Sequence, residues 1–341
     1  MSMLLTRRSA LLGGAGALAA PWIARAQQKP TIRLTTGWSF QGNHSYMLHA
    51  QRAGYFASAG ANVVVSRGFG SARTPVDIAG GVFELGFSDV PSVVKFVAEN
   101  PGADVIMVAI LEDTTQTAMT VLADGPIKKP KDIEGHSLAA PESDLGRLLF
   151  PSYAKLAGID ASKVSWISIA PELREPMLVQ KRAAGITGNP SATAMNLRRI
   201  GIDLPQQRLF FYRDAGLDLF SSCFVASRKF SEREPEAMKA AMAGLFRAYV
   251  EYYRDPTEAL KTLVAVEPLT DLKVETDRVA YLKSLLPIGK YMKENGISAI
   301  EPARLEACIR MLEAAYALPT RLSNERVYTD AYLPPAAQRM I

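Results

Sequence analysis

The feature of this sequence that most constrains its fold is residues 32–89, where three strand-like segments alternate with two helical ones. Residues 32–36 alternate apolar and polar side chains, residues 62–66 are rich in β-branched side chains, and residues 84–87 form a third short strand. Helical spacing over residues 46–53, and a helix start with Thr74 as cap and Pro75 at its first position, predict the helices between them. The order βαβαβ predicts a parallel sheet, because parallel neighbours need a long and usually helical crossover.

Polar, aromatic or glycine residues follow each of these three strands. Parallel strands place their carboxyl ends along one edge, and open α/β sheets bind ligands in the crevice beyond that edge. We therefore expect half of a small-molecule site there. Its candidate residues are Trp38, Asn43, His44, Gly70, Ser71, Arg73, Ser88 and Asp89.

The alternation continues along the chain and predicts a second α/β unit. Residues 105–111 form a continuous apolar run typical of a strand buried on both faces. Pro151 is a potential break in a helix over 145–156, and Ser231 with Glu234 fits a capping box before a helix over 235–253. Further strands are expected at 118–122, 135–140, 164–169, 185–187, 209–212 and 219–227, and further helices at 91–99, 172–182, 191–200, 256–266, 275–286 and 302–317.

This pattern predicts an α/β fold with two mixed, mostly parallel sheets joined by two crossings. The first crossing is expected around Thr115 and the second at residues 214–222. Residues 27–116 and 221–341 would then form lobe 1, and residues 117–220 lobe 2. Candidate site residues on the first crossing and after strands of lobe 2 are Thr115, Gln116, Ser143, Asp144, Asn189 and Ser191, each of which either contacts a ligand or caps a helix.

The first 26 residues have the features of a secretory signal peptide. Arg7 and Arg8 precede an uncharged run, and Ala24 and Ala26 give a small-x-small cleavage signature. The paired arginines predict export by the twin-arginine route, with a chance pair in an ordinary signal as the alternative. We expect the product to be free in the periplasm.

Charge and cysteine content exclude several classes of protein. Removal of residues 1–26 takes away three arginines and no acid, lowering the formal charge from +5 to +2, and no basic stripe remains to follow nucleic-acid phosphates. No later stretch is long and apolar enough to span a membrane. Cys308 lies in an amphipathic helical pattern, so we expect Cys223 and Cys308 to be small buried side chains rather than a disulfide.

Taken together, several motifs resemble the NMT1/THI5-like group of periplasmic solute-binding proteins. The resemblance extends over nearly all of the chain after residue 26 and is stronger up to about residue 170. The residues that carry it are Trp38, Asn43, His44, Ser45, Ala53, Gly54, Tyr55, Phe56, Gly60, the turn at 68–71, Gly81, Gly86, Asp89, Ile127, the segment 131–135 and the segment 162–164.

The resemblance implies a bilobed periplasmic-binding-protein fold of type II and a receptor for an ABC importer. The expected partners are a small-molecule ligand and a permease in the inner membrane, with the receptor itself a monomer and without a cofactor. The loop from Trp38 to Ser45 resembles members that bind pyrimidine precursors of thiamine. The segment 182–189 departs from those members, which carry an Asp followed by aromatic residues there, so the ligand is left open.

The residues themselves favour two ligand classes equally. Trp38 offers a flat face for a planar heterocycle. Its alternative role is to pack as a hydrophobic side chain between the loop and the following helix. Arg73 and the backbone N–H groups before Thr74 would instead suit a small organic anion such as a sulfonate. His44 is not expected to bind a metal, since His49 follows it by five residues and not by four.

The alternative function is an enzyme of the thiamine-precursor synthase type that modifies a pyrimidine on the same scaffold. The chain lacks the cysteine cluster of that fungal branch, and it contains no nucleophile elbow, zinc-binding helix motif or phosphate-binding loop. The sequence therefore predicts a binding protein rather than an enzyme.

Overall fold

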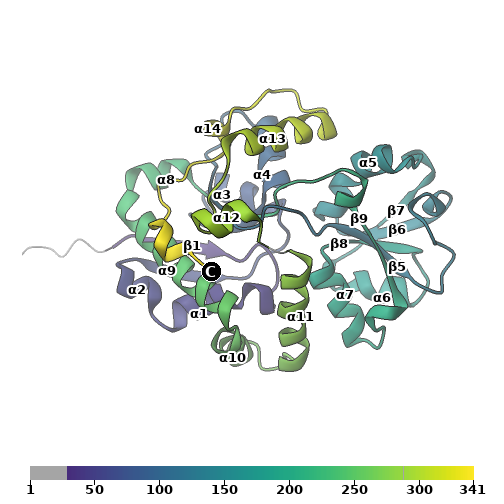
Figure 1. Ribbon diagram of the computed structural model, residues 1–341, viewed down its shortest axis with the longest axis horizontal. Helices are drawn as coiled ribbons and strands as arrows, with labels where there is room; N and C mark the ends of the chain where they lie inside the picture. Colours follow the sequence, from purple (N-terminus) through teal and green to yellow (C-terminus); the bar gives the residue numbers. More distant parts are fainter. Residues whose placement is uncertain (1–28, 287) are drawn as a thin grey trace, which may run out of the picture.

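The computed structural model describes residues 29–286 and 288–341, which form two five-stranded sheets in two lobes (Figure 1). The predicted signal peptide lies outside these residues. Lobe 1 holds the sheet with order β2-β1-β3-β10-β4, and lobe 2 the sheet with order β7-β6-β8-β5-β9. The strands are β1 (Thr31–Thr35), β2 (Asn62–Ser66), β3 (Leu85–Asp89), β4 (Ile106–Ile110), β5 (Ala118–Leu122), β6 (Ser137–Ala140), β7 (Ser165–Ser168), β8 (Gly185–Gly188), β9 (Gln207–Phe211) and β10 (Ser222–Ala226).

Helices surround both sheets, and most of the chain after β10 is helical (Figure 1). The α-helices are α1 (Ser45–Arg52), α2 (Tyr55–Ala59), α3 (Arg73–Ala79), α4 (Val90–Glu99), α5 (Leu145–Ala157), α6 (Arg174–Val179), α7 (Pro190–Arg199), α8 (Arg228–Arg233), α9 (Pro235–Arg254), α10 (Thr257–Val266), α11 (Leu272–Leu285), α12 (Lys290–Asn295), α13 (Pro302–Tyr316) and α14 (Asn324–Val327). Short 3-10 turns are η1 (Gly42–His44), η2 (Pro130–Ile133), η3 (Ala161–Lys163), η4 (Pro171–Leu173), η5 (Leu204–Gln206), η6 (Tyr212–Ala215) and η7 (Ala336–Arg339).

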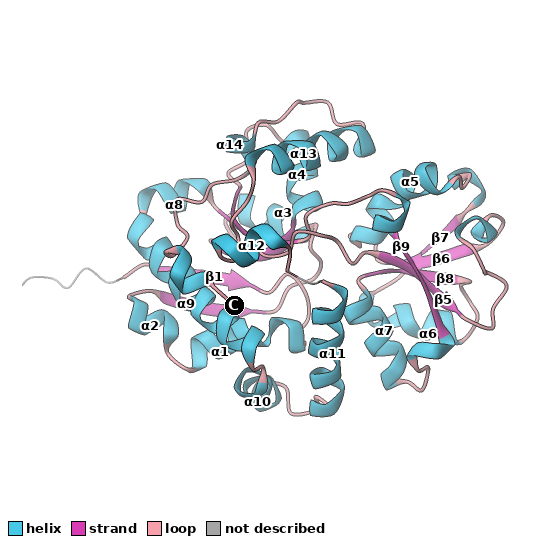
Figure 2. Cartoon of the chain, in the orientation of Figure 1, coloured by secondary structure: helices cyan, strands magenta, loops and turns pink. Residues whose placement is uncertain are grey.

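The sheet pairing confirms the predicted fold class. Strands β1, β2 and β3 are parallel, as the βαβαβ order requires, while β10 runs antiparallel to β3 and β4. In the second sheet β6 is parallel to β7 and β8, and β5 is antiparallel to β8 and β9. The antiparallel strands β5 and β10 are those that follow a crossing. The crossing between β4 and β5 is a loop, and the one between β9 and β10 contains η6 (Figure 2).

The core is built around strand β4, where the sequence predicts burial on both faces. All five of its residues are buried, between the neighbouring strand β10 and the helices that cover the sheet. Cys223 and Cys308 are free thiols within the same apolar cluster, which confirms the prediction that they pack as small hydrophobic side chains. The exact lobe boundaries at residues 116 and 220 stay a prediction.

Two predicted helix caps are wrong, although α9 begins at Pro235 as predicted. Helix α3 begins at Arg73, and Thr74 does not cap it but donates from Oγ1 to the carbonyl of Phe87, 3.1 Å away. Ser231 lies inside α8, where its hydroxyl donates to the carbonyl of Ser227. Ser227 is the residue that caps α8, accepting from Phe230 N at 3.0 Å. Helix α3 has no side-chain cap, because the hydroxyl of Thr74 is engaged by Phe87 in strand β3.

Three further elements differ from prediction. Helix α5 continues through Pro151 without a break. The expected helix over 172–182 is the turn η4 followed by the short α6, which ends at Val179. Helix α2 was not predicted: Gly54, in the left-handed conformation, ends one helical segment and begins the next, so that a single helix becomes two.

Candidate ligand-binding cleft

A cavity of about 100 Å³ lies between the lobes, at the carboxyl ends of strands from both sheets. Residues from lobe 1, the first crossing, lobe 2 and the helices α9 and α11 all line it. Of the predicted site residues, those that line it are Trp38, Asn43, His44, Ser71, Gln116, Ser143, Asp144, Asn189 and Ser191. The other predicted residues, which do not line it, are Gly70, Arg73, Ser88, Asp89 and Thr115.

Trp38 faces a buried arginine from the opposite lobe. The guanidinium carbon of Arg174 lies 5.7 Å from the centre of the Trp38 ring. Arg174 is 2% exposed and pairs with Asp144 at 3.3 Å and with Glu175 at 2.9 Å. Burial alone would lower the pKa of Arg174, but these two carboxylates raise it, so the guanidinium stays charged and compensated. One face of the indole is therefore covered by a cation that already has its counter-ions.

His44 is held as a neutral ring. Its Nδ1 lies 3.2 Å from the carbonyl oxygen of Ser39, and its Nε2 lies 3.1 Å from the amide nitrogen of Asn43. A carbonyl can only accept and an amide nitrogen can only donate, so the proton belongs on Nδ1. Burial lowers the pKa of His44 to about 4. Neither Asn43 nor Ser45 caps the helix that follows, since α1 has no side-chain cap and Ser45 donates to the carbonyl of Gly42.

The glycine turn brings the two lobes into contact. A Cβ atom on Gly70 would lie 2.7 Å from Oγ of Ser143 in lobe 2, so only glycine allows this approach. The φ angle of +136° at Gly70 is also one that other residues rarely adopt. Beside it, the carbonyl of Ser71 accepts from the hydroxyl of Ser88. Gly70 and Ser88 thus shape the edge of the cleft without lining it.

The remaining predicted residues outside the lining are engaged by the protein itself. Arg73 pairs with Asp77 through a 2.6 Å contact on the exposed side of α3. Asp89 caps α4 by accepting from Ser92 N at 2.8 Å. Thr115 bonds to the hydroxyl of Thr117 at 2.9 Å. These three side chains therefore bond to other parts of the protein and do not line the cleft.

The cleft-lining residues Gln116, Asn189 and Asp144, from the first crossing and lobe 2, accept hydrogen bonds from other residues of the protein. Oε1 of Gln116 accepts from the backbone N–H of Ser191 at 3.0 Å, which joins the first crossing to the start of α7. Oδ1 of Asn189 accepts from the hydroxyl of Thr117 at 3.2 Å. Asp144 caps α5 through Arg147 N and also accepts from Thr187. These bonds fix the loops of lobe 2 around the cleft.

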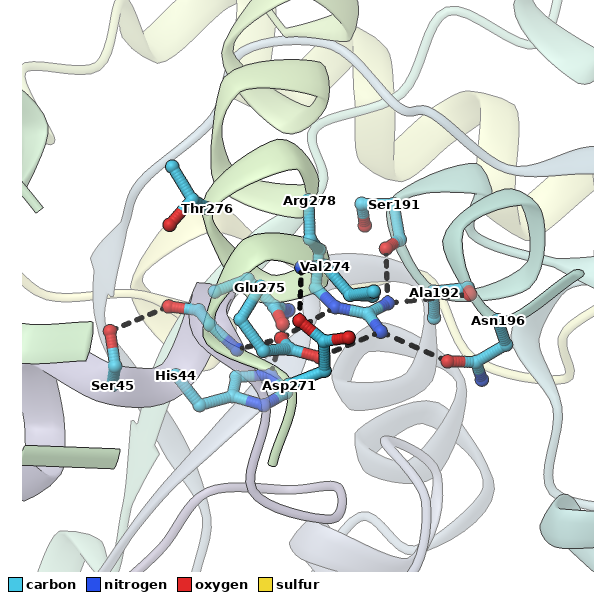
Figure 3. Close-up of polar contacts among 12 residues, drawn as sticks. His44, Ser45, Ser191, Ala192, Asn196, Asp271, Val274, Glu275, Thr276 and Arg278 are labelled. Carbon is cyan, nitrogen blue, oxygen red and sulfur yellow. Dashed lines mark hydrogen bonds and ion pairs between the residues drawn. The ribbon is translucent and has the colours of Figure 1, made fainter. Parts of the chain in front are cut away.

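Helix α11 ties the two lobes together beside the cleft (Figure 3). Arg278 is 1% exposed, donates to the carbonyl of Ser191 at 2.5 Å, and donates to Oδ1 of Asn196 at 2.9 Å. Glu275 accepts from Arg278 and from the backbone N–H of Gly42, the latter at 2.6 Å. One ion pair on α11 therefore joins the loop that carries Asn43 and His44 to the first residues of α7.

The sequence profile described as "NMT1/THI5 like" matches residues 41–259. The chain belongs to this family. No curated protein matches its sequence.

The fold of this NMT1/THI5-like protein is shared by several solved structures. It resembles the alkanesulfonate-binding protein SsuA from Xanthomonas axonopodis pv. citri bound to MOPS, with a TM-score of 0.67 and 15% identity over 90% of this chain and 99% of that one. For the periplasmic aliphatic sulphonate-binding protein SsuA from Escherichia coli, the TM-score is 0.66 and the identity 13%, over 88% of this chain and 92% of that one. For the periplasmic nitrate-binding protein NrtA from Synechocystis PCC 6803, the TM-score is 0.65 and the identity 13%, over 89% of this chain and 87% of that one. These likenesses establish the periplasmic-binding-protein fold.

Sequence reasoning missed much of the cleft of this NMT1/THI5-like chain. Helix α9 supplies Tyr249, Tyr252 and Tyr253, and α11 supplies Lys283, although the tail after residue 231 was predicted only as helical cover. Glu112 lies in the polar patch of the first crossing but was not singled out. The signal that could have indicated α9 is its run of aromatic residues at helical spacing, which equally fits a buried core face.

No metal site and no membrane span are found in the part of the chain that the structure describes. Within 29–286 and 288–341, no three His, Cys, Asp or Glu side chains gather as a metal site would require. Over the same residues, no helix has both the length and the apolar character to cross a membrane.

Proposed function

We propose that this protein is the solute-binding component of an ABC importer, which captures a small organic nutrient between its lobes and delivers it to a membrane permease. The observation that carries the proposal is the cleft itself: loops at the carboxyl ends of strands from two separate sheets face each other around it. Apolar and aromatic walls with a few placed polar groups are how small-ligand pockets are built. Membership of the NMT1/THI5-like family agrees with this use of the fold.

The proposal includes location and partners. Residues 1–26 would direct export to the periplasm, by the twin-arginine route, and the exported receptor would act as a monomer. Its ligand would be a pyrimidine-like heterocycle or a small organic anion such as a sulfonate. The walls formed by Trp38 and Phe87 support the heterocycle. The engagement of Arg73 with Asp77 removes the main residue that favoured an anion.

The second candidate is an enzyme that modifies a pyrimidine on the same scaffold. The thiol nearest the cleft offers it little support, because burial raises the pKa of Cys223 well above its ordinary value and Cys223 does not line the cavity. We therefore propose capture and release of an unchanged solute.

Native mass spectrometry of the protein purified from its own periplasm tests the proposal. We expect one small molecule bound per chain, which returns unchanged after release. Added back at a hundredfold over its Kd, it should stabilise the folded protein by about 2.7 kcal/mol. Isolation of a chemically altered product would support the enzyme instead. A chain that carries no solute from the periplasm and gains no stability from periplasmic extract would contradict solute capture.

A further inference from the structure

One end of the cleft is rich in oxygen atoms that lack hydrogen-bond partners. Among the described residues, the buried atoms without a partner include Oε1 of Gln41, Oδ1 of Asn43 and the hydroxyls of Tyr46 and Tyr252, and all four side chains line the cavity. Tyr46 is 1% exposed and Tyr252 is 4% exposed. A buried polar atom without a protein partner is costly, so a set of them around a cavity is suited to hydrogen bonds with a bound molecule.

Glu112 adds a carboxylate to these oxygens. Its Oε2 accepts from the hydroxyl of Ser222 at 2.7 Å and from Ser222 N at 3.3 Å. No ion pair of Glu112 is found within residues 29–286 and 288–341. Burial raises the pKa of Glu112, as expected for a carboxylate without a counter-ion. We call Gln41, Asn43, Tyr46, Glu112 and Tyr252 the acceptor pocket.

The tyrosines of the acceptor pocket form one aromatic group with Tyr249. The ring centre of Tyr46 lies 5.1 Å from that of Tyr249 and 5.4 Å from that of Tyr252. Burial raises the pKa of Tyr46, and the charge of Glu112 raises it further. The phenols therefore stay protonated, and Glu112 is the group of the acceptor pocket whose ionisation a cationic ligand would favour.

The cations that line the cleft are already engaged, and so do not prepare it for an anion. Arg174 is compensated by Asp144 and Glu175. The ammonium of Lys283 donates to the carbonyl of Tyr253 at 2.5 Å, and burial lowers its pKa. His44 is neutral at neutral pH because its pKa is about 4. A sulfonate at this end of the cleft would meet the carboxyl group of Glu112, which has no ion-pair partner among the described residues.

We propose that the acceptor pocket binds a positively charged nitrogen group of the ligand, of the amidinium, guanidinium or ammonium class. This assignment rests on the proposed function and specifies its ligand. The N–H groups of such a ligand would donate to Glu112 and to the unpartnered oxygens of Gln41, Asn43, Tyr46 and Tyr252, which only a group with several donors can satisfy together. Aromatic rings beside the carboxylate add a favourable environment for the cation.

Two probes of the same shape and opposite charge test the assignment. Benzamidinium and benzenesulfonate each carry one charged group on one planar ring. Their binding to the purified chain, after removal of any bound solute by unfolding and refolding, is measured by isothermal titration calorimetry. We expect benzamidinium to bind and benzenesulfonate not to bind. Glu112→Gln should weaken benzamidinium binding about tenfold to a hundredfold, since a charge-assisted hydrogen bond is lost.

Two more variants complete the test. Tyr252→Phe removes one acceptor oxygen without changing charge and should weaken benzamidinium binding about threefold to tenfold. Glu236→Gln neutralises an exposed carboxylate of α9 outside the acceptor pocket and should leave binding unchanged. The proposal is overturned if benzamidinium does not bind, if Glu112→Gln and Tyr252→Phe both bind it as the unaltered protein does, or if benzenesulfonate binds more tightly. Each of these results leaves solute capture standing when native mass spectrometry finds a bound solute.

Discussion

At the scale of single residues, His44 is neutral because only one proton fits its surroundings. Its Nδ1–H donates to Ser39, and its bare Nε2 accepts from Asn43. A second proton would turn Nε2 into a donor facing another donor, in a site that burial has already made hostile to charge. Protonation of His44 should therefore loosen the loop that carries Asn43.

This gives a pH dependence with a definite sign. The pKa of His44 is about 4 in the folded protein and about 6.5 when unfolded, so the unfolded chain binds the extra proton between these values. The stabilisation is complete above pH 6.5 and is lost as the pH falls towards 4, by about 3 kcal/mol. Urea unfolding at pH 7 and pH 4.5 should show a larger loss for the unaltered protein than for His44→Gln. His136→Gln changes a residue outside the cleft and should lose as much stability between pH 7 and pH 4.5 as the unaltered protein. If His44→Gln also loses as much stability as the unaltered protein, His44 is not the source of the pH dependence.

At the scale of elements, α11 acts as a brace between the lobes through the pair of Glu275 and Arg278. Replacement of Arg278 by Met keeps an unbranched apolar stem but leaves Glu275 buried without its cation. We expect a loss of about 3–5 kcal/mol in the free energy of unfolding, the usual cost of breaking a buried ion pair. The double variant Arg278→Met/Glu275→Met should recover part of this loss, because no uncompensated charge remains, although the bonds of the pair to Gly42 and Ser191 stay lost.

A second ion pair on the same helix provides the matched control. Arg198 of α7 pairs with Asp277 of α11 at 2.6 Å, but both side chains are about one-third exposed. Arg198→Met should therefore cost no more than about 1 kcal/mol. Urea unfolding of the three variants measures these differences. Equal losses for Arg198→Met and Arg278→Met would show that α11 braces the lobes by surface packing and not by its buried pair.

The same elements show how far sequence reasoning extends. The βαβαβ order fixed the parallel sheet and so placed Trp38, Ser71 and His44 beside one edge, because strand direction follows from connectivity alone. Arg278 and Tyr252 could not be placed in this way. Arg278 donates to Ser191, 87 residues away, and the ring of Tyr252 packs on that of Tyr46 from a helix far away in the sequence. Helical periodicity predicts that such a side chain is buried without saying which residue it contacts.

At the scale of the whole molecule, the structure has the lobes in contact. Gly70 approaches Ser143, and Arg67 reaches Glu172 across the cleft with 3.9 Å between their charged atoms. A ligand enclosed between lobes can enter only if they separate, and the two crossings are the connections about which they can move. A ligand that binds the closed form more tightly than the open form shifts the population towards the closed form. The size of this shift is set by the ratio of its affinities for the two forms.

Closure can be tested with a side chain inserted at the point of contact. Ser143→Tyr places a large ring where Gly70 leaves no room, so the lobes should stay apart even with solute present. Small-angle X-ray scattering should give a smaller radius of gyration for the solute-loaded protein than for protein stripped by unfolding and refolding. Ser143→Tyr should keep the larger value in both states and bind the periplasmic solute at least tenfold more weakly. Glu142→Tyr adds the same ring one residue earlier, outside the cleft lining, and should close normally. If Ser143→Tyr contracts with solute as the unaltered protein does, the lobes do not close through this contact.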